Sequence, residues 1–337
     1  MTFQVIKKQQ PTTGGLNGTI YRLENVESGD CIEVWPALGF NCIHWEASTG
    51  DEASVDILYA DPALFADGRP TRSGIPILFP FPNRIAEGRF TWEGNQYLLP
   101  LNDSTKKNAA HGFVCRRPWR VVDQGAEEDQ AWITGEFELA KDDPESSQHW
   151  PANFVLRVTY RVSSRRLRVE AEVTNPDRVA LPFGLGYHPY FRLPLSGEDK
   201  DQCQVQVPAQ SFWELDESIP TGVLNPVDEM RDLRQLRAFR DLSVDDVLTG
   251  IQSEGAEAPE GLRWNGSIHD GTTNVRVFSS PVFRELVVFT PPHRNAFCIE
   301  PYTCPTNAIN LAAQGMDVGW LRLEPEQKWN SVVELVI

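Results

Sequence analysis

The stretch GLGYHPYFRL runs from Gly184 to Leu193 and sets the interpretation of the rest of the chain. Read as a β-strand, it places alternate side chains on opposite faces. The small or polar face consists of Gly184, Gly186, His188 and Tyr190. The apolar face consists of Leu185, Tyr187, Pro189 and Phe191. Glycines leave room for another group to approach the backbone, and Pro189 favours an extended conformation at His188. The pattern predicts a histidine presented to a ligand, with a core histidine bonded to a carbonyl as the alternative.

A second stretch of the same kind is AFCIEP, from Ala296 to Pro301. Alternation places Glu300 on one face with Ala296 and Cys298, at the predicted end of a strand. An unpaired carboxylate is costly to bury, so Glu300 is either an ion-pair partner or a group held for chemistry. His188 and Glu300 are therefore a candidate acid/base pair.

The composition indicates a globular protein with a neutral ligand. Of the 337 residues 41% are hydrophobic, and 17 Phe and 10 Trp favour aromatic packing between sheets. A net charge of −16 disfavours nucleic acid and anionic membranes as partners, so we expect a small molecule. The six cysteines form no CxxC pair, and the first residues, MTFQVIKKQQ, lack the apolar run of a signal peptide. We therefore expect reduced cysteines and a cytoplasmic location.

The order of the chain favours an all-β fold with few short helices. Alternating segments such as FVLRVTYRV and RLRVEAEVTN predict strands, which Ser163-Ser164 joins as a hairpin, and Gly94-Asn95 predicts another turn. The segment 61–70 has room for one helical turn. Leu233, Leu236 and Phe239 have the spacing of a short amphipathic helix within 228–239. The whole pattern predicts a sandwich of β-sheets.

Five motifs, in their order along the chain, resemble the galactose mutarotase or aldose 1-epimerase family. They are NRI (83–85), HG (111–112), GYHPYF (186–191), DDVLTG (245–250) and IEPYTCPTNAIN (299–310). The resemblance extends from about residue 30 to the end of the chain. It implies one domain, residues 1–337, folded as a large antiparallel β-supersandwich with a sugar-binding cleft across one face. It also implies that the protein uses no metal and no organic cofactor.

The resemblance implies a role for each matching residue. His188 would be the general acid that protonates the ring oxygen of a sugar, and Glu300 the general base that takes the proton of the anomeric hydroxyl. The residues implied to hold the sugar are Asn83, Arg84, His111 and Asp245, with Asp246 as the alternative to Asp245. Taken alone, Arg84 could brace a loop, His111 could be an ordinary loop histidine, and Asp245 could cap a turn.

Two positions depart from the family pattern. Val287 stands where many members carry Gln, so one contact to a sugar hydroxyl is expected to be absent. Arg192 stands in YFRL where the family has YFNL. Alternation leaves Arg192 on the face of His188, where its guanidinium would suit a phosphate, but Pro189 and Pro194 bracket it. We expect an exposed arginine and a neutral substrate.

The leading hypothesis is a cofactor-independent aldose 1-epimerase that acts on a free hexose. The alternatives are a hexose-6-phosphate 1-epimerase and a non-catalytic carbohydrate-binding protein on the same fold. A glycoside hydrolase would normally use two carboxylates, whereas the marked pair is a histidine and a glutamate. The sequence leaves open which sugar is preferred and whether the protein is a monomer or a homodimer.

Overall fold

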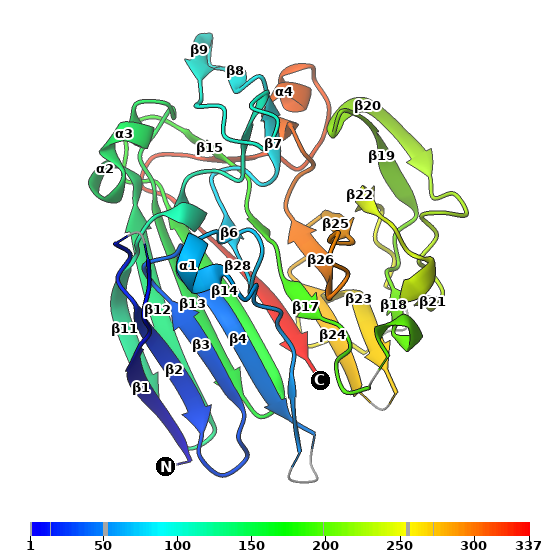
Figure 1. Ribbon diagram of the computed structural model, residues 1–337. Helices are drawn as coiled ribbons and strands as arrows, with labels where there is room; N and C mark the ends of the chain where they lie inside the picture. Colours follow the sequence, from blue (N-terminus) through cyan, green and yellow to red (C-terminus); the bar gives the residue numbers. More distant parts are fainter. Residues whose placement is uncertain (1, 14, 50–52, 198, 254–256, 272) are drawn as a thin grey trace.

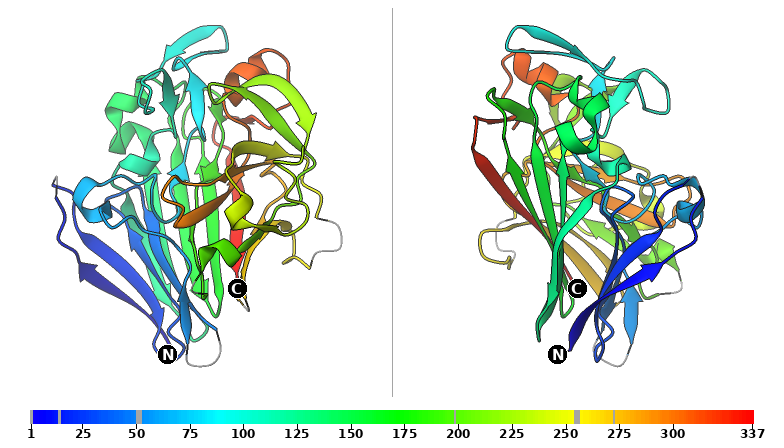
Figure 2. Two further views of the ribbon diagram at one scale, coloured as in Figure 1. Left: turned by 45° about the vertical axis from the view of Figure 1, so that its right-hand side comes forward. Right: turned by 90° about the vertical axis from the view of Figure 1, so that its left-hand side faces the viewer.

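The structure is a computed structural model that describes residues 2–13, 15–49, 53–197, 199–253, 257–271 and 273–337 (Figure 1). Its sheets are built from antiparallel strand pairs and form two large layers that pack face to face. Figure 2 shows the N-terminal sheet lying against a larger sheet, with both chain ends toward the same end of the molecule. The predicted all-β antiparallel architecture is confirmed.

One layer is a nine-stranded sheet. In order across the sheet its strands are β11 (Arg120–Ala126), β12 (Gln130–Glu138), β13 (Val155–Ser163), β14 (Arg166–Thr174), β28 (Lys328–Val336), β24 (Thr273–Ser279), β23 (Arg263–Asp270), β18 (Gln204–Gln206) and β21 (Arg237–Ala238). Strand β28 comes from the C-terminal end of the chain and pairs with β14 on one side and β24 on the other. The last strand of the chain therefore joins the two halves of this layer.

The second layer consists of a five-stranded and an eight-stranded sheet. The five strands are β1 (Phe3–Gln9), β2 (Thr19–Asn25), β3 (Cys31–Trp35), β4 (Asn41–Ser48) and β5 (Ser54–Asp56). The eight are β20 (Ile219–Pro226), β19 (Ser211–Asp216), β22 (Asp245–Thr249), β25 (Glu285–Phe289), β26 (Ala296–Tyr302), β16 (Gly186–Tyr187), β6 (Ile77–Leu78) and, beside β26, β17 (Tyr190–Arg192). A bridge between Leu58 and Phe191 connects the two sheets.

The remaining elements are short, and most of them lie toward the top of the molecule in Figure 1. The two-stranded sheets are β7 (Arg84–Ala86) with β10 (Asn108–Ala110), β8 (Arg89–Trp92) with β9 (Asn95–Leu98), and β15 (Leu181–Phe183) with β27 (Leu321–Leu323). The helices are α1 (Leu64–Asp67), α2 (Leu139–Asp142), α3 (Pro144–Ser147), α4 (Ala308–Ala313) and the 3-10 turns η1 (Val114–Arg116), η2 (Lys200–Gln202) and η3 (Phe239–Asp241). Within the described ranges, none of these helices has the length and apolar character needed to cross a bilayer.

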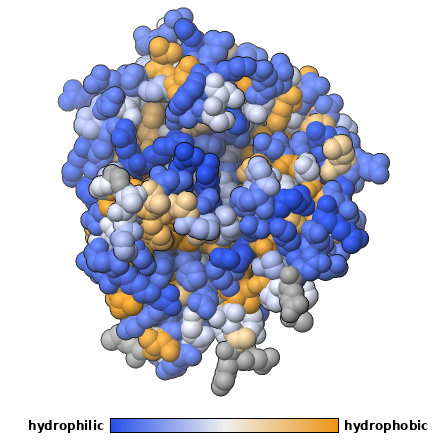
Figure 3. All heavy atoms as spheres, viewed as in Figure 1, coloured by the Kyte–Doolittle hydropathy of each residue, from blue (hydrophilic) through white to orange (hydrophobic). Residues whose placement is uncertain are grey.

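A continuous hydrophobic core lies between the layers. In β12, β13 and β14 every second residue is buried, as a strand with one face on the core requires. The core includes fully buried Phe137, Leu156 and Tyr160, and it extends from Phe3 to Leu335. Each such side chain contributes about 1.5–3 kcal/mol by leaving water. Figure 3 shows the outer face in this view as mostly hydrophilic, with apolar residues in small separate groups.

Three local predictions need correction. The segment 228–239 is not an α-helix: Leu233 and Phe239 are buried, but Leu236 is 43% exposed. Its backbone bonds to the residues on either side of β18 instead: the Leu233 carbonyl accepts from Val207 N, and Phe239 N donates to the Cys203 carbonyl. The two hairpin turns each differ by one residue from the prediction. The turn residues between β8 and β9 are 93–94, and those between β13 and β14 are 164–165.

Strands β25 and β26 have both faces covered, and this places the functional side chains. Leu286, Val288, Phe297 and Ile299 point into the main core. The intervening residues point to the opposite face of the sheet, where Val287 on β25 is directly opposite Glu300 on β26. The sheet therefore separates the hydrophobic core from a second, partly polar surface.

Candidate active site

The histidine strand is interrupted at His188. Strand β16 ends at Tyr187 and β17 begins at Tyr190, because Pro189 has no N–H to donate. The His188 N–H donates to the Pro76 carbonyl at 3.0 Å, which fixes the backbone there. At Gly186 a Cβ would lie 2.5 Å from Cδ1 of Tyr302, so only glycine leaves room for that ring. The expected close approach at the glycines is confirmed.

Glu300 lies within β26 and not at a strand end, because the ladder continues through Pro301 to Tyr302. Its side chain is 1% exposed, and Oε2 accepts a hydrogen bond from the Tyr302 hydroxyl at 2.6 Å. The other oxygen, Oε1, lies 3.4 Å from Nδ1 of His188. The structure therefore brings the two predicted acid/base residues together, although they are far apart in the sequence.

Three buried polar atoms at this place have no hydrogen-bond partner. They are Nδ1 of His188, Oε1 of Glu300 and Nδ1 of His111. The rings of His111 and His188 lie edge to face with centroids 6.0 Å apart. Buried polar atoms are nearly always hydrogen-bonded, and each exception calls for an explanation. Three exceptions around one cavity indicate atoms that are available to a polar ligand.

Burial shifts the two central groups in opposite directions. It lowers the pKa of His188 from 6.5 to about 3. Burial also raises the pKa of Glu300 well above its ordinary value, while the Tyr302 hydrogen bond and Arg84 act to lower it and Asp245 to raise it. Each isolated charge is therefore disfavoured, whereas one proton held between the two groups leaves the pair without net charge. A pair with one proton can donate at one atom and accept at another.

The predicted sugar-binding residues line the same cavity of about 180 Å³. Its lining consists of Thr71, Asn83, Arg84, His111, His188, Tyr190, Asp245, Val287, Phe289, Glu300 and Tyr302. Arg84 Nη1 donates to Oδ1 of Asn83 at 2.9 Å, and the Asn83 carbonyl accepts from His111 N at 2.7 Å. Asn83 and His111 both have positive φ, 53° and 64°, so this corner is an ordered turn. Arg84 and His111 are held by the same loop contacts.

The structure distinguishes the two adjacent aspartates. Asp245 begins β22, lies opposite Phe289 on β25 and lines the cavity. Asp245 is exposed as a residue, but desolvation of its carboxyl group raises its pKa, and Arg84 acts to lower it. Asp246 points to the other side, where its Oδ1 accepts from Nε of Arg231 at 2.7 Å. Asp245 is therefore the aspartate that can reach a ligand in this cavity, and Asp246 holds a surface segment.

Sequence reasoning missed the two tyrosines that support the pair. The Tyr190 ring is parallel to the His188 ring with centroids 4.5 Å apart, and its hydroxyl donates to the Thr71 carbonyl at 2.7 Å. Tyr302 holds one oxygen of Glu300. Both tyrosines follow their partner by two residues, so alternation along a strand could have indicated them. Thr71 lies in a loop, where the sequence pattern gives no such signal.

Arg192 does not line this cavity. Its Nη2 lies 2.8 Å from Oδ2 of Asp56, and its side chain is 39% exposed. The strand pattern of β17 breaks off after this residue, so the guanidinium extends toward β5 and not toward His188. A phosphate at the site would need another cation.

Two groups of side chains have the spacing of metal ligands. His188, Cys298 and Glu300 offer ligand atoms that all lie within 4.8 Å of one another, as do Cys31, His44 and Glu46. Zinc accepts these ligand types, so neither group is unsuitable in chemistry. The members of each group come from separate segments of the chain, so spacing along the sequence does not indicate them. The expectation of a metal-free site stays a prediction.

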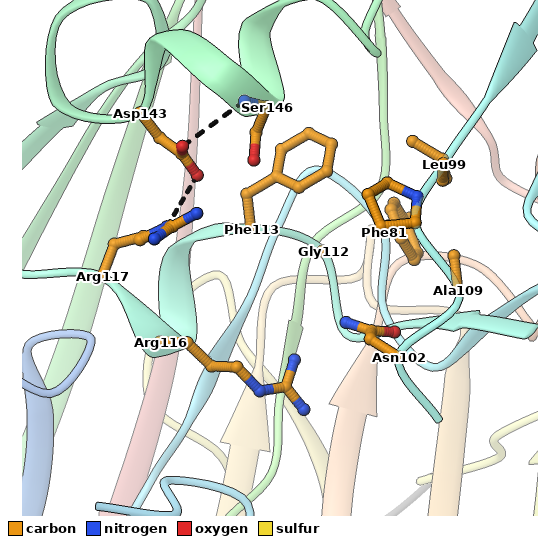
Figure 4. Close-up of a pocket in the computed structure, with 11 residues that line it drawn as sticks. Phe81, Leu99, Asn102, Ala109, Gly112, Phe113, Arg116, Arg117, Asp143 and Ser146 are labelled. Atoms are coloured by element: carbon orange, nitrogen blue, oxygen red, sulfur yellow. Dashed lines mark hydrogen bonds and ion pairs between the residues drawn. The ribbon is translucent and has the colours of Figure 1, made fainter. Parts of the chain in front are cut away.

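A second cavity, of about 260 Å³, has Gly112 and Phe113 in its lining (Figure 4). It is lined by residues such as Phe81, Phe113 and Arg116. The Asp143 carboxylate accepts from Arg117 at 2.8 Å and from the Ser146 N–H, as the dashed lines show. None of its 11 lining residues holds a buried polar atom without a partner. The smaller cavity is therefore the candidate active site.

Comparison with known proteins gives one consistent family. The family model described as aldose 1-epimerase matches residues 38–336. The uncharacterized protein YihR of Escherichia coli K12 is 28% identical over 219 residues, which are 65% of this chain and 66% of that protein. A galactose mutarotase-like protein from Clostridium acetobutylicum has a TM-score of 0.83 at 22% identity, covering 99% of this chain and 98% of that chain. Galactose 1-epimerase from Lactobacillus acidophilus has a TM-score of 0.76 at 16% identity, with the same coverage. The predicted supersandwich fold is confirmed.

Proposed function

Because the chain belongs to the aldose 1-epimerase family, we propose that it interconverts the α and β anomers of a free hexose as a cofactor-independent isomerase. The observation that carries this proposal is the set of three unpartnered buried atoms, on His111, His188 and Glu300, in one cavity. A sugar can both donate and accept hydrogen bonds through its hydroxyls, so it satisfies atoms of both kinds.

The proposed chemistry moves one proton at each end of the reacting bond. Glu300 takes the proton of the anomeric hydroxyl while His188 gives a proton to the ring oxygen. The bond between the anomeric carbon and the ring oxygen breaks, and the anomeric carbon becomes an aldehyde. The pair ends with its proton on Glu300 instead of His188, so the total number of protons in the site does not change. Concerted transfer avoids a charged sugar intermediate.

Reclosure reverses both transfers. After the aldehyde rotates about the neighbouring carbon–carbon bond, the ring hydroxyl attacks its other face. His188 takes the proton of that hydroxyl, and Glu300 returns its proton to the new anomeric oxygen. The pair is restored with its proton on His188. Asn83, Arg84, His111 and Asp245 would hold the remaining hydroxyls through both steps, because guanidinium and carboxylate groups suit the two roles of a hydroxyl.

Two observations bear on the alternatives. Arg192, the residue that raised the possibility of a sugar phosphate, is paired with Asp56 outside the cavity. This supports a neutral hexose over its 6-phosphate. The close approach of His188 and Glu300 supports turnover over simple binding, since a binding protein gains nothing from a proton pair of this kind.

The experiment is polarimetry on freshly dissolved α-sugars, with the wild type compared with His188→Ala and Glu300→Gln. Each variant should lower kcat by about a hundredfold or more, the scale of a lost general acid or base. Circular dichroism serves as the control that both variants are folded. Near wild-type mutarotation by either folded variant would remove that residue from the mechanism. A wild type that accelerates no sugar would refute the proposal.

A further inference from the structure

The Tyr302 side chain contacts Glu300 within the same strand. The two residues are two apart in β26 and share a face, and the Tyr302 hydroxyl donates to Oε2 at 2.6 Å. Tyr302 is 0% exposed, so water does not compete for this bond. One oxygen of the carboxyl group is fixed in this way, and Oε1 is left facing His188.

The Tyr302 ring is held on both sides. The backbone of Tyr302 is paired with Gly186 on β16 and with Glu285 on β25. The ring packs so closely on Gly186 that a Cβ there would lie 2.5 Å from Cδ1 of the tyrosine. Burial raises the pKa of Tyr302 well above its ordinary value, so the hydroxyl keeps its proton. Tyr302 is therefore a permanent donor in a fixed position.

A hydrogen bond donated to a carboxyl oxygen stabilises the charged form of that group. In a pair that holds one proton, stabilising the Glu300 carboxylate favours the proton on His188. We propose that Tyr302 is a positioning residue that places the shared proton on His188 and so leaves Glu300 as the base. This inference rests on the proposed function for its catalytic meaning, but the position of the proton can be measured without turnover.

The surroundings of Glu300 contain other groups that act on its charge. The titratable and charged neighbours are His188, Tyr302, Arg84, Asp245 and Cys298. Arg84 favours the carboxylate, whereas Asp245 disfavours it. Among the side chains that the structure describes, Tyr302 is the one recorded as donating a hydrogen bond to Glu300. Removal of its hydroxyl should therefore change the proton distribution, while the four residues proposed to hold the sugar hydroxyls, Asn83, Arg84, His111 and Asp245, stay in place.

The test is Tyr302→Phe, which removes the hydroxyl and keeps the ring. We expect kcat to fall about tenfold to a hundredfold, the effect of losing a hydrogen bond to a charged group. KM should change less than about threefold, because Tyr302 is proposed to act through Glu300. Loss of the bond also raises the pKa of Glu300, so the alkaline limb of kcat/KM should move to higher pH.

The matched control is Tyr187→Phe. Tyr187 is a neighbouring tyrosine that is 1% exposed, and its hydroxyl has no hydrogen-bond partner. It points into the main core, away from the cavity. Removing this hydroxyl should leave kcat within about twofold and the pH profile unchanged. This control shows whether the loss of a buried tyrosine hydroxyl outside the cavity by itself alters kcat or the pH profile.

A measurement that needs no turnover is nitrogen NMR of His188 in the wild type and in Tyr302→Phe. At neutral pH the variant should show a smaller fraction of protonated imidazole. An unchanged His188 signal, or an unchanged alkaline limb in an active variant, would overturn the role given to Tyr302. If the wild type turned over no sugar, the proposed function would fail, while the NMR comparison would still decide where Tyr302 places the proton.

Discussion

Val287 on β25 lies directly opposite Glu300 on β26, so an apolar side chain flanks the candidate base. Val287 is 3% exposed and lines the cavity together with Phe289. A sugar hydroxyl facing this wall would lose its water without gaining a partner, which costs about 1–3 kcal/mol. Val287 is therefore expected to influence which hexose the site prefers.

Val287→Gln should raise kcat/KM for some hexoses relative to others by about tenfold, because the amide supplies a partner for a hydroxyl that valine leaves unpaired. The measurement is kcat/KM across a panel of hexoses and their monodeoxy analogues. Val288→Ala, on the core side of the same strand, is the control, since it should affect stability and not preference. A uniform change for all sugars in Val287→Gln would contradict a role in specificity.

The pH profile of kcat/KM should lack the step of an ordinary histidine. In the free protein the acid limb appears when the pair gains a second proton, so that His188 and Glu300 are both protonated. Burial lowers the pKa of His188 to about 3, so this limb lies below pH 5. We expect kcat/KM to change less than about twofold between pH 7 and 5, after subtraction of the spontaneous rate. A tenfold fall over that interval would mean that His188 titrates as an exposed histidine does.

Arg192→Ala should leave the rates on a neutral hexose and on its 6-phosphate within about twofold of the wild type. The reason is that Arg192 pairs with Asp56 and lies outside the cavity lining. Arg84→Ala is the matched variant, since Arg84 does line the cavity and should lower kcat/KM at least tenfold. A preference of the wild type for the phosphorylated sugar that is lost in Arg192→Ala would favour the hypothesis of a hexose-6-phosphate 1-epimerase.

Removal of divalent metals should leave activity unchanged, since the proposed steps need only the protons of His188 and Glu300. The measurement is the rate of mutarotation after dialysis against excess chelator. The grouping of His188, Cys298 and Glu300 makes this a sharp test, because these side chains could also hold a metal ion. Activity that disappears with the chelator and returns with zinc would replace the acid/base mechanism by a metal-assisted one.

Glu285 should make the protein less stable as pH rises. Its carboxyl group is 2% exposed and is bonded to the Trp213 and Thr249 side chains, and burial raises its pKa from 4.5 to about 7. Between pH 4.5 and about 7 the unfolded chain loses this proton while the folded protein keeps it, so the free energy of unfolding falls with pH. The fall attributable to Glu285 is about 3 kcal/mol.

Glu285→Gln removes the titrating group and keeps a side chain of the same shape. Urea denaturation at pH 4.5 and 7.5 should show a smaller loss of stability in this variant than in the wild type. The same pH dependence in both proteins would mean that Glu285 is already charged when folded.

Alternation and the order of five motifs were enough to predict the fold class and to choose the six candidate residues. The structure shows all six lining one cavity. The sequence did not predict the contact between His188 and Glu300, since β16, β17 and β26 meet only through tertiary pairing. It also did not separate Asp245 from Asp246, because adjacent residues of one strand differ only in the face they occupy.

The wrong helix prediction at 228–239 has a similar cause. Leu233 and Phe239 are buried and lie six residues apart, a spacing that fits one face of a helix. An extended segment that contacts the core at two points can have the same spacing. Arg237 Nη1 donates to the carbonyls of Glu229 and Met230, and these contacts hold the segment in an irregular form. Local spacing cannot show that the backbone partners lie in β18 and in the strand ends around it.

The unpartnered atoms of His111, His188 and Glu300 carry a cost in the free protein, because each buried polar group without a hydrogen bond destabilises the fold by about 1–3 kcal/mol. A sugar that supplies those bonds removes the cost, and a ligand that binds only the folded state raises the melting temperature. Thermal denaturation in the presence of each sugar of a library would therefore identify the preferred substrate from the rise in melting temperature alone. This holds even for sugars whose anomers equilibrate too quickly for polarimetry.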